Sequence, residues 1–389
     1  MLSLLALVLL GTCGAYITVV LPAVVKELVD TIGISGTQAG YIVTFEKLGM
    51  ALASLSLFFV VNRFDKRLMA VGFLLLLAAS NFFSAHLSSF EQFCAVRFLC
   101  GVSEGAVIAL MTAQAASGHS PDRTFGLYLA ATLGLAMVSF AWMPDLLQTY
   151  GLAGVFYSMA AVAVVTIVSI PLFPKSFQVE TSDAAMKTQS PSLPTSVRWQ
   201  VALALAATFL FEAAIGAVWN FISLIAIDVG FTEAQINSGL SQAMIVGVIG
   251  GIMATLIGQR FGRLGPIILG VTIMMASLFS LAVGTAWLSF LVITMLFMFS
   301  WIFTLPFFVG AVSGLDPSGR AAVMSIAVQT GGLMAGPLLS AELIRGSDSY
   351  GQIIWAGLLI LSLCMLTIVA ALGKSFRTKD VSYGEVVTS

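Results

Sequence analysis

The sequence predicts an all-α integral membrane protein in which twelve transmembrane helices form two six-helix pseudo-repeats. Composition, the lengths of the apolar runs and an internal repeat support this fold class. Of the 389 residues, 59% are hydrophobic and 9% charged, and the mean hydropathy is +1.03. Because soluble domains carry about 25% charged residues, most of this surface cannot face water.

The apolar runs have the length of membrane-spanning helices. A helix needs about 20 residues to cross the hydrocarbon core, whereas barrel strands need about 10 alternating ones. Backbone groups in lipid must bond within the protein, and a helix achieves this alone. The expected spans are 3–25, 37–61, 68–87, 90–116, 124–146, 151–173, 199–224, 234–258, 264–285, 287–313, 319–343 and 350–373.

Two landmarks repeat at an offset of 197 residues. The segment 62–66 aligns with 259–263, and Arg123 aligns with Arg320. We therefore expect an N-terminal half (1–173), a cytoplasmic linker rich in Ser, Thr and Pro (174–198), a C-terminal half (199–373) and a loose cytoplasmic tail (374–389). Parallel repeats are typical of transporters whose substrate site lies between the halves.

The distribution of Lys and Arg predicts the orientation. Cytoplasmic loops are enriched in these residues. With the N-terminus inside, the outer side holds only Lys26 and Arg345, so both termini are expected in the cytoplasm. The inner side then holds thirteen basic residues: Arg63, Lys66, Arg67, Arg123, Lys175, Lys187, Arg198, Arg260, Arg263, Arg320, Lys374, Arg377 and Lys379.

The fourth span carries two charges at a high cost. Arg97 and Glu104 lie in the apolar run 90–116, where each costs about 2.5–3.5 kcal/mol by insertion scales. Seven residues are about two helical turns, so both share one face. Gly101 and Gly105 continue this face at the small-xxx-small spacing that admits a neighbouring helix. The face is therefore expected to meet protein or water.

Three more charges lie inside predicted spans. Lys47 extends a helical stripe formed by Thr37, Tyr41 and Thr44 and is expected to face a cavity, whereas Glu46 would point about 100° away. Each could contact substrate or form an interhelical pair. Glu212 lies in the seventh span and either is protonated or pairs across the cavity, with Lys47 or Arg97 as possible partners.

No enzyme chemistry is expected. Cys13, Cys94, Cys100 and Cys364 lie in spans without metal-ligand spacing, and His86 and His119 lie at span ends. The sequence has no Gly-Lys-Ser/Thr loop to cradle a phosphate. The first apolar run is too long for a signal peptide. We expect no cofactor, no metal and no nucleic-acid partner.

The loops after spans two and eight resemble a motif of the major facilitator superfamily, Gly-x-Leu-Ala-Asp-Arg-x-Gly-Arg-Arg. Arg63 and Arg260 keep the arginine, but Asn62 and Gln259 replace the aspartate. The resemblance implies the major facilitator fold, with spans one, four, seven and ten lining the cavity. It also implies a latch at the cytoplasmic ends of the helices, weakened here by the missing aspartates.

The segment Arg97-x-x-x-Gly101 with Glu104-Gly105 is similar to the fourth-helix motif of the anion:cation symporter branch. The resemblance implies that Glu104 is a protonation site and Arg97 its partner. The acid–base pair of that branch is missing from the first span. Span five also lacks the Gly-Pro antiporter motif, and a similar segment occurs in span eleven with Gly332, Gly336 and Pro337.

These residues predict a secondary active transporter that imports a small organic anion with protons. Arg97 is the expected anion anchor, although it could instead pack helices or form a permanent lock with Glu104 or Glu46. Glu104, Glu212 and Glu46 are the candidate proton-coupling residues. Lys47 and five polar or aromatic residues could complete the substrate site: Tyr16, Trp219, Asn220, Gln329 and Trp301.

Two alternatives remain open at this stage. The first is a proton-coupled exporter of amphipathic or cationic compounds, which the three acidic residues Glu46, Glu104 and Glu212 would attract. The second is a membrane sensor or a scaffold without transport. A monomer in the inner (cell) membrane, surrounded by the lipid bilayer, is expected in either case.

Overall fold

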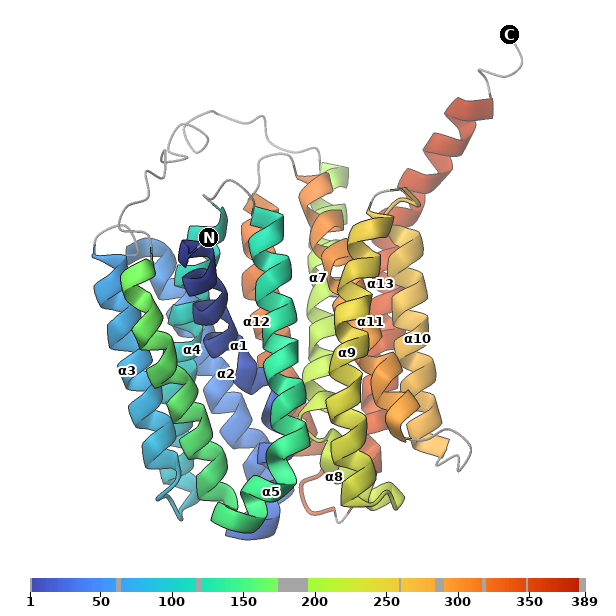
Figure 1. The fold of residues 1–389 in the computed structure, drawn as a ribbon. Coiled ribbons are helices and arrows are strands. Elements are labelled where there is room, and N and C mark those ends of the chain that lie inside the picture. Colours follow the sequence, from blue (N-terminus) through green and yellow to red (C-terminus); the bar gives the residue numbers. More distant parts are fainter. Residues whose placement is uncertain are drawn as a thin grey trace.

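The computed structural model describes residues 2–60, 64–116, 121–173, 195–258, 260–283, 290–316, 320–347 and 349–384. The predicted linker lies almost entirely outside these ranges, as does Arg63. In Figure 1 most helices of the first half, coloured blue to green, are on the left and most of the second half, yellow-green to red, are on the right, with residues 320–343, in orange, near the middle.

The first half contains five long helices and two short ones. Asp65 caps α3 by accepting hydrogen bonds from the backbone N–H groups of Arg67 and Leu68. The long α5 covers two predicted spans and changes direction at Gly151, whose φ of 62° lies outside the helical region. The elements are α1 (Leu2–Glu27), the π-helix η1 (Leu28–Ile32), α2 (Gly36–Val60), α3 (Lys66–Ser84), α4 (Phe90–Ala116), α5 (Pro121–Ser169) and the 3-10 helix η2 (Ile170–Leu172).

The second half follows the same plan. Its helices are α7 (Thr195–Trp219), α8 (Ile222–Val229), α9 (Glu233–Ile257), α10 (Leu264–Val283), α11 (Phe290–Leu315), α12 (Arg320–Leu343) and α13 (Gly351–Gly384). Both bounds of α9 lie 197 residues after those of α2, which matches the offset of the sequence landmarks.

Two element boundaries differ from the prediction. The seventh span was expected as one helix to residue 224, but α7 ends at Trp219 and α8 begins at Ile222. The Asn220 side chain donates to the Gly216 carbonyl at 2.5 Å and so competes for a helical acceptor. In addition, α13 runs to Gly384, although a loose tail was expected from Lys374; no proline interrupts this stretch.

The two halves meet mainly through two helix pairs, and α1 also contacts α8. α2 packs against α12, and α5 packs against α9. The most extensive helix contact of the first half is α2 with α4. That of the second half is the equivalent pair, α9 with α11. The start of α1 and the end of α13 lie at the same end of the bundle (Figure 1).

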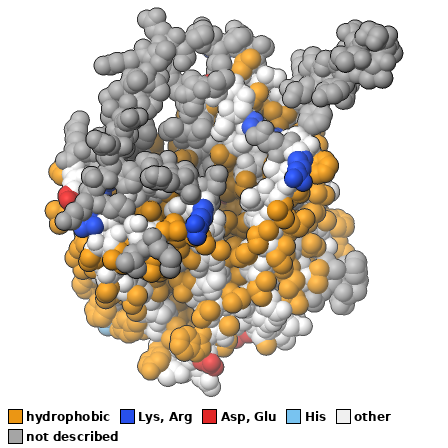
Figure 2. Space-filling view, turned by 45° about the horizontal axis from the view of Figure 1, so that its top comes forward, with side chains coloured by type: hydrophobic (Ala, Val, Ile, Leu, Met, Phe, Trp, Pro, Cys, Tyr) orange, Lys and Arg blue, Asp and Glu red, His pale blue; other side chains and the backbone are white. Residues whose placement is uncertain are grey.

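The surface is suited to lipid. Within the described ranges, nine segments are long and apolar enough to cross a membrane, and one of them, Arg123–Leu172, is long enough for two spans. Large apolar side chains such as Val168 and Leu256 are 77% and 69% exposed. Figure 2 shows hydrophobic side chains over the flank of the bundle.

A buried charge cluster and an aromatic site

The charge cluster of the first half is organised by Arg97. This side chain is 1% exposed and donates through Nε to Glu46 Oε2 at 2.7 Å. Nη1 donates to Asn81 Oδ1 at 2.9 Å, and the guanidinium carbon lies 5.9 Å from the ring centroid of Phe156. Helices α2, α3, α4 and α5 therefore all contribute to holding one arginine.

Glu46, and not Glu104, is the main partner of Arg97. The Nη2–Oε1 distance from Arg97 to Glu104 is 3.9 Å, which is beyond a hydrogen bond. The lock between Arg97 and Glu46 was one of the alternatives from the sequence, and it is the arrangement that the structure contains. The shared face of Arg97 and Glu104 does turn toward protein, because both residues are buried.

Lys47 and Glu46 point to different neighbours but belong to one cluster. Lys47 Nζ donates to Thr18 Oγ1 on α1 at 2.7 Å and to Glu46 Oε1 at 3.4 Å. Lys47 is 1% exposed and Glu46 is fully buried. The two cations, Glu46 and Thr18 thus form a continuous chain of polar contacts from α4 through α2 to α1.

Glu104 is the member of the cluster without hydrogen bonds. It is fully buried, and neither carboxylate oxygen has a hydrogen-bond partner among the described residues. Burying an ionised carboxylate without hydrogen bonds costs far more than burying a neutral one. Glu104 therefore differs from Glu46, which accepts hydrogen bonds from Arg97.

Small residues allow the helices of the cluster to approach. A Cβ added at Gly105 would lie 2.2 Å from the Met50 carbonyl oxygen, and Gly101 is held against α2 in the same way. In the second half, a Cβ at Gly332 would lie 2.6 Å from the Phe209 carbonyl oxygen, and one at Gly336 2.3 Å from the Ala217 nitrogen. The glycines singled out in the sequence thus lie at backbone-to-backbone contacts.

Of the two arginines predicted to form the cytoplasmic latch, the structure describes Arg260, whereas Arg63 lies outside the described ranges. Arg260 is exposed just after α9. Its neighbour Arg263, which the sequence analysis did not select for the site, lies against Gly310 and Gly314 of α11, and a Cβ at Gly310 would be 3.4 Å from its Nε. Pro337 lies inside α12, where its carbonyl oxygen is near Gly40 of α2.

Glu212 is apart from the other four charges. It lies on α7 in the second half and is 1% exposed; Trp301 of α11 is its hydrogen-bonding neighbour, and Oε2 has no hydrogen-bond partner in the described part of the chain. Trp219 is stacked on Phe297 at 5.6 Å and meets Trp301 edge-on at 6.1 Å. Neither Lys47 nor Arg97 pairs with Glu212 in this structure, so it does not contain the ion pair that was one of the two alternatives from the sequence.

The remaining predicted site residues are dispersed. Tyr16 donates to Ser139 of α5 at 2.7 Å, and the Trp219 indole donates to the Val19 carbonyl of α1 at 3.1 Å. Asn220 and Gln329 bond within their own segments, to Gly216 and Ser325. The structure thus joins Trp219 to α1 but does not gather these four residues around Arg97.

Asn81 and Thr18 are members of the cluster that sequence reasoning missed. Asn81 is an amide in an otherwise apolar span, and such polar residues are uncommon enough to be a signal. Thr18 gives no comparable signal, because threonine hydroxyls often bond to their own helix.

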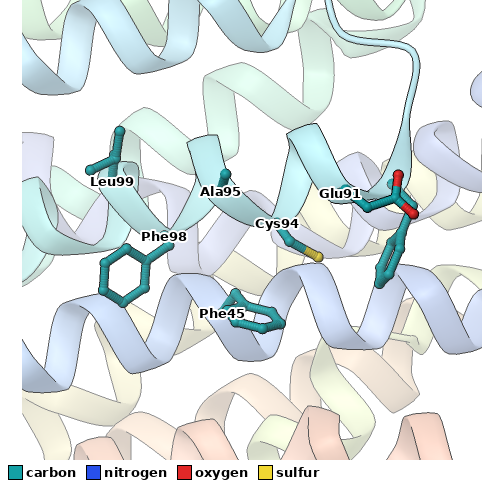
Figure 3. A pocket seen from close by; sticks show the side chains of 7 residues that line it. Phe45, Glu91, Cys94, Ala95, Phe98 and Leu99 are labelled. Atoms are coloured by element: carbon teal, nitrogen blue, oxygen red, sulfur yellow. The ribbon is translucent and has the colours of Figure 1, made fainter.

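A separate apolar groove lies on the outer surface between α2 and α4. It has a volume of about 680 Å³ and is lined by Phe45, Phe90, Glu91, Cys94, Ala95, Phe98 and Leu99 (Figure 3). Phe45 and Leu99 are each 42% exposed. The buried charges do not line it, so this groove belongs to the lipid-facing surface and not to the charge cluster.

Two six-helix halves that bury a charge cluster between membrane-spanning helices define a membrane transporter. The sequence profile of the Major Facilitator Superfamily matches residues 4–341, and the chain belongs to this family of secondary transporters.

Similar proteins agree with this assignment. The chain is 21% identical over 370 residues to the uncharacterized MFS-type transporter YceJ of Bacillus subtilis (strain 168), covering 93% of this chain and 94% of YceJ. Among solved structures, a mutant of the nucleoside transporter NupG has a TM-score of 0.76 at 12% identity, covering 95% of this chain and 100% of that one. A D-xylose-proton symporter has a TM-score of 0.74 at 17% identity, covering 95% of both chains.

Proposed function

We propose that this transporter couples the uptake of a small organic anion, such as a carboxylate, to protons by alternating access. The observation that carries the proposal is the unequal partnering of two buried carboxylates beside one guanidinium. Glu46 accepts hydrogen bonds from Arg97, and Glu104 accepts none from the described residues. Glu104 is therefore the proton carrier, and Glu46 is the fixed counter-ion of Arg97.

Charge balance links the proton to the anion. With Glu104 protonated, the cluster holds the cations Arg97 and Lys47 against the single carboxylate of Glu46. The excess positive charge attracts one anion, and an anion bound there in turn stabilises the protonated cluster. Substrate and proton thus favour each other, and together they favour the state that binds both.

Flux in proteoliposomes tests the proposal. An imposed inward proton gradient should drive accumulation of an organic anion from a panel that also contains lipophilic cations. Glu104→Gln should abolish gradient-driven accumulation while leaving counterflow. Glu91→Gln is the matched control, because Glu91 is an exposed glutamate on the same helix. Intact gradient-driven accumulation in Glu104→Gln would refute the coupling role.

A second function, export of amphipathic or cationic compounds, is favoured by the surroundings of Glu212. A carboxylate that is hydrogen-bonded to Trp301, whose ring in turn meets Trp219, has the chemistry that binds an organic cation. This alternative predicts proton release on substrate addition and loss of cation flux in Glu212→Gln. Accumulation of an anion, together with unchanged cation flux in Glu212→Gln, would reject the export function.

We propose that the protein is a monomer in the inner (cell) membrane. Both of its termini lie in the cytoplasm. The excess of basic residues at one end supports this orientation. Cysteines introduced near Arg260 and near Arg345 should react with an impermeant maleimide on opposite sides of the membrane. Reaction of the Arg260 position from outside intact cells would reverse the assignment.

A further inference from the structure

A second pocket, which is polar, lies between the halves at the end of the bundle that contains η1. We call this end of the bundle the η1 end. It has a volume of about 360 Å³ and is lined by residues of α1, η1, α5, α8 and α9. Charged and polar residues from both halves face it: Lys26, Glu27, Asp30, Ser223, Glu233 and Asn237.

One ammonium group lies among three carboxylates in this pocket. Lys26 Nζ is 3.1 Å from Glu27, 2.9 Å from Asp30 and 2.8 Å from Glu233. Glu27 and Asp30 belong to the same half as Lys26, whereas Glu233 begins α9 in the other half. The Lys26 ammonium therefore joins the two halves.

The pocket has more charged and hydrogen-bonding groups than the Lys26 ammonium alone satisfies. The lining side chains carry three formal negative charges against one positive charge, so the surplus favours a cation. Ser223 is 1% exposed, and its hydroxyl has no hydrogen-bond partner among the described residues. A buried hydroxyl without a partner is costly, which indicates that a group bound in the pocket completes its bonding.

We propose that the pocket at the η1 end is a cation site shared by the two halves. The Lys26 ammonium fills this site when the η1 end is closed, and an external primary ammonium group can take its place when Lys26 is removed. Three donor hydrogens on an ammonium match three carboxylate acceptors. Occupancy by any such cation holds Glu233 of the second half against Glu27 and Asp30 of the first.

Two further hydrogen bonds between the halves show that the η1 end is closed in this structure. Trp219 bonds to Val19 of α1, and Ser241 of α9 donates to the Met137 carbonyl of α5 at 2.9 Å. Opening the η1 end separates α1 from α9, so the Lys26–Glu233 contact must break. The site thus opposes opening by an amount that depends on its cation and not on the transported substrate.

The test measures how fast Ile236→Cys reacts with a polar maleimide. Ile236 lines the pocket and is 1% exposed, so it reacts only when this end opens. Lys26→Ala and Glu233→Gln should each raise the rate by about threefold to tenfold, a range that allows for the exposure of Glu233. Glu91→Gln is the matched control, since Glu91 is an exposed glutamate of the first half that does not line this pocket, and it should leave the rate within about twofold.

Chemical rescue tests the ligand class. Ethylammonium should slow the reaction of Lys26→Ala back toward the unmodified rate, while tetraethylammonium, which has no N–H donors, should not. Rescue should be lost in Lys26→Ala with Glu233→Gln. The exchanged pair Lys26→Glu with Glu233→Lys provides a folded variant if Lys26→Ala is unstable, and it should restore slow labelling.

The proposal is overturned if Lys26→Ala and Glu233→Gln label at the unmodified rate, or if ethylammonium has equal effects with and without Glu233. Because labelling can be performed in detergent and needs no substrate, failure here is distinguishable from failure of proton-coupled anion uptake.

Discussion

Gly101 of α4 lies against the backbone carbonyl of Glu46 on α2, so closely that a Cβ at position 101 would be 1.8 Å from that oxygen. The reverse contact is formed by Gly49, where a Cβ would lie 2.3 Å from the Phe98 carbonyl oxygen. Backbone atoms cannot rotate away as side chains do. These contacts therefore fix the distance between the two helices and, with it, the position of Glu46 beside Arg97.

Gly101→Ala should destabilise the protein by about 1–3 kcal/mol, the usual cost of overpacking, because α2 and α4 must move apart. Unfolding in detergent, followed by circular dichroism, measures this loss. Gly134→Ala on α5 is the control, since a Cβ there meets nothing within 4 Å. Equal stability of the two variants would mean that α2 and α4 are not in close contact.

Glu46→Gln should cost more stability than Glu104→Gln. Removing one partner of a buried ion pair costs about 3–5 kcal/mol, and Glu46 is the hydrogen-bonded partner of Arg97. Glu104 accepts no hydrogen bond from the described residues, so a neutral amide replaces it at small cost. The same unfolding assay compares them. A larger loss in Glu104→Gln would identify Glu104 as the true partner of Arg97.

Trp301→Phe should weaken the site around Glu212 by about 1–3 kcal/mol, because the ring remains but the indole donor is lost. In a Glu212→Gln background the same change should cost less, and a double-mutant cycle gives the coupling energy. Trp355→Phe on the exposed face of α13 is the control. A coupling energy of zero would show that the two side chains do not interact.

Alkaline pH should destabilise the fold through Tyr350. Burial raises the pKa of Tyr350 above its usual value of 10.0, and the carboxylates of Asp228 and Asp30 raise it further. The folded protein therefore holds the phenol proton more tightly, and this stabilisation is present below about pH 10 and lost as pH rises through the raised pKa.

The Tyr350→Phe variant should thus lose less stability than the unmodified protein between about pH 9.5 and 11. Thermal unfolding at several pH values measures the slope, and Tyr150→Phe at an exposed position is the control. Identical slopes for all three proteins would contradict the assignment.

Most of the fold was accessible from the sequence because its determinants are local. The length of an apolar run decides whether a helix can cross the membrane, and glycines such as Gly151 mark where helices turn. The offset of 197 residues also appears in the bounds of α2 and α9. The break after Trp219 was missed, because no proline or glycine marks it at positions 219–222.

The candidate site was accessible only in part. The charges Glu46, Lys47, Arg97 and Glu104 were identifiable because each is costly in an apolar span. Their pairing was not, since Glu46 and Glu104 are both within reach of Arg97 and only the relative rotation of α2 and α4 decides between them. Asn81 stands out in its apolar span, but its bond to Arg97 from a third helix depends on tertiary packing.

The pairing of Arg97 with Glu46 has an electrical consequence. Both charges lie in the same half, so they move together and carry no net charge through the membrane field when the halves rock. A moving unit charge would be worth about 2.3 kcal/mol per 100 mV. The voltage dependence of transport should therefore report on Lys47, on the protonation of Glu104 and Glu212, and on the substrate, while the Arg97–Glu46 pair remains electrically silent.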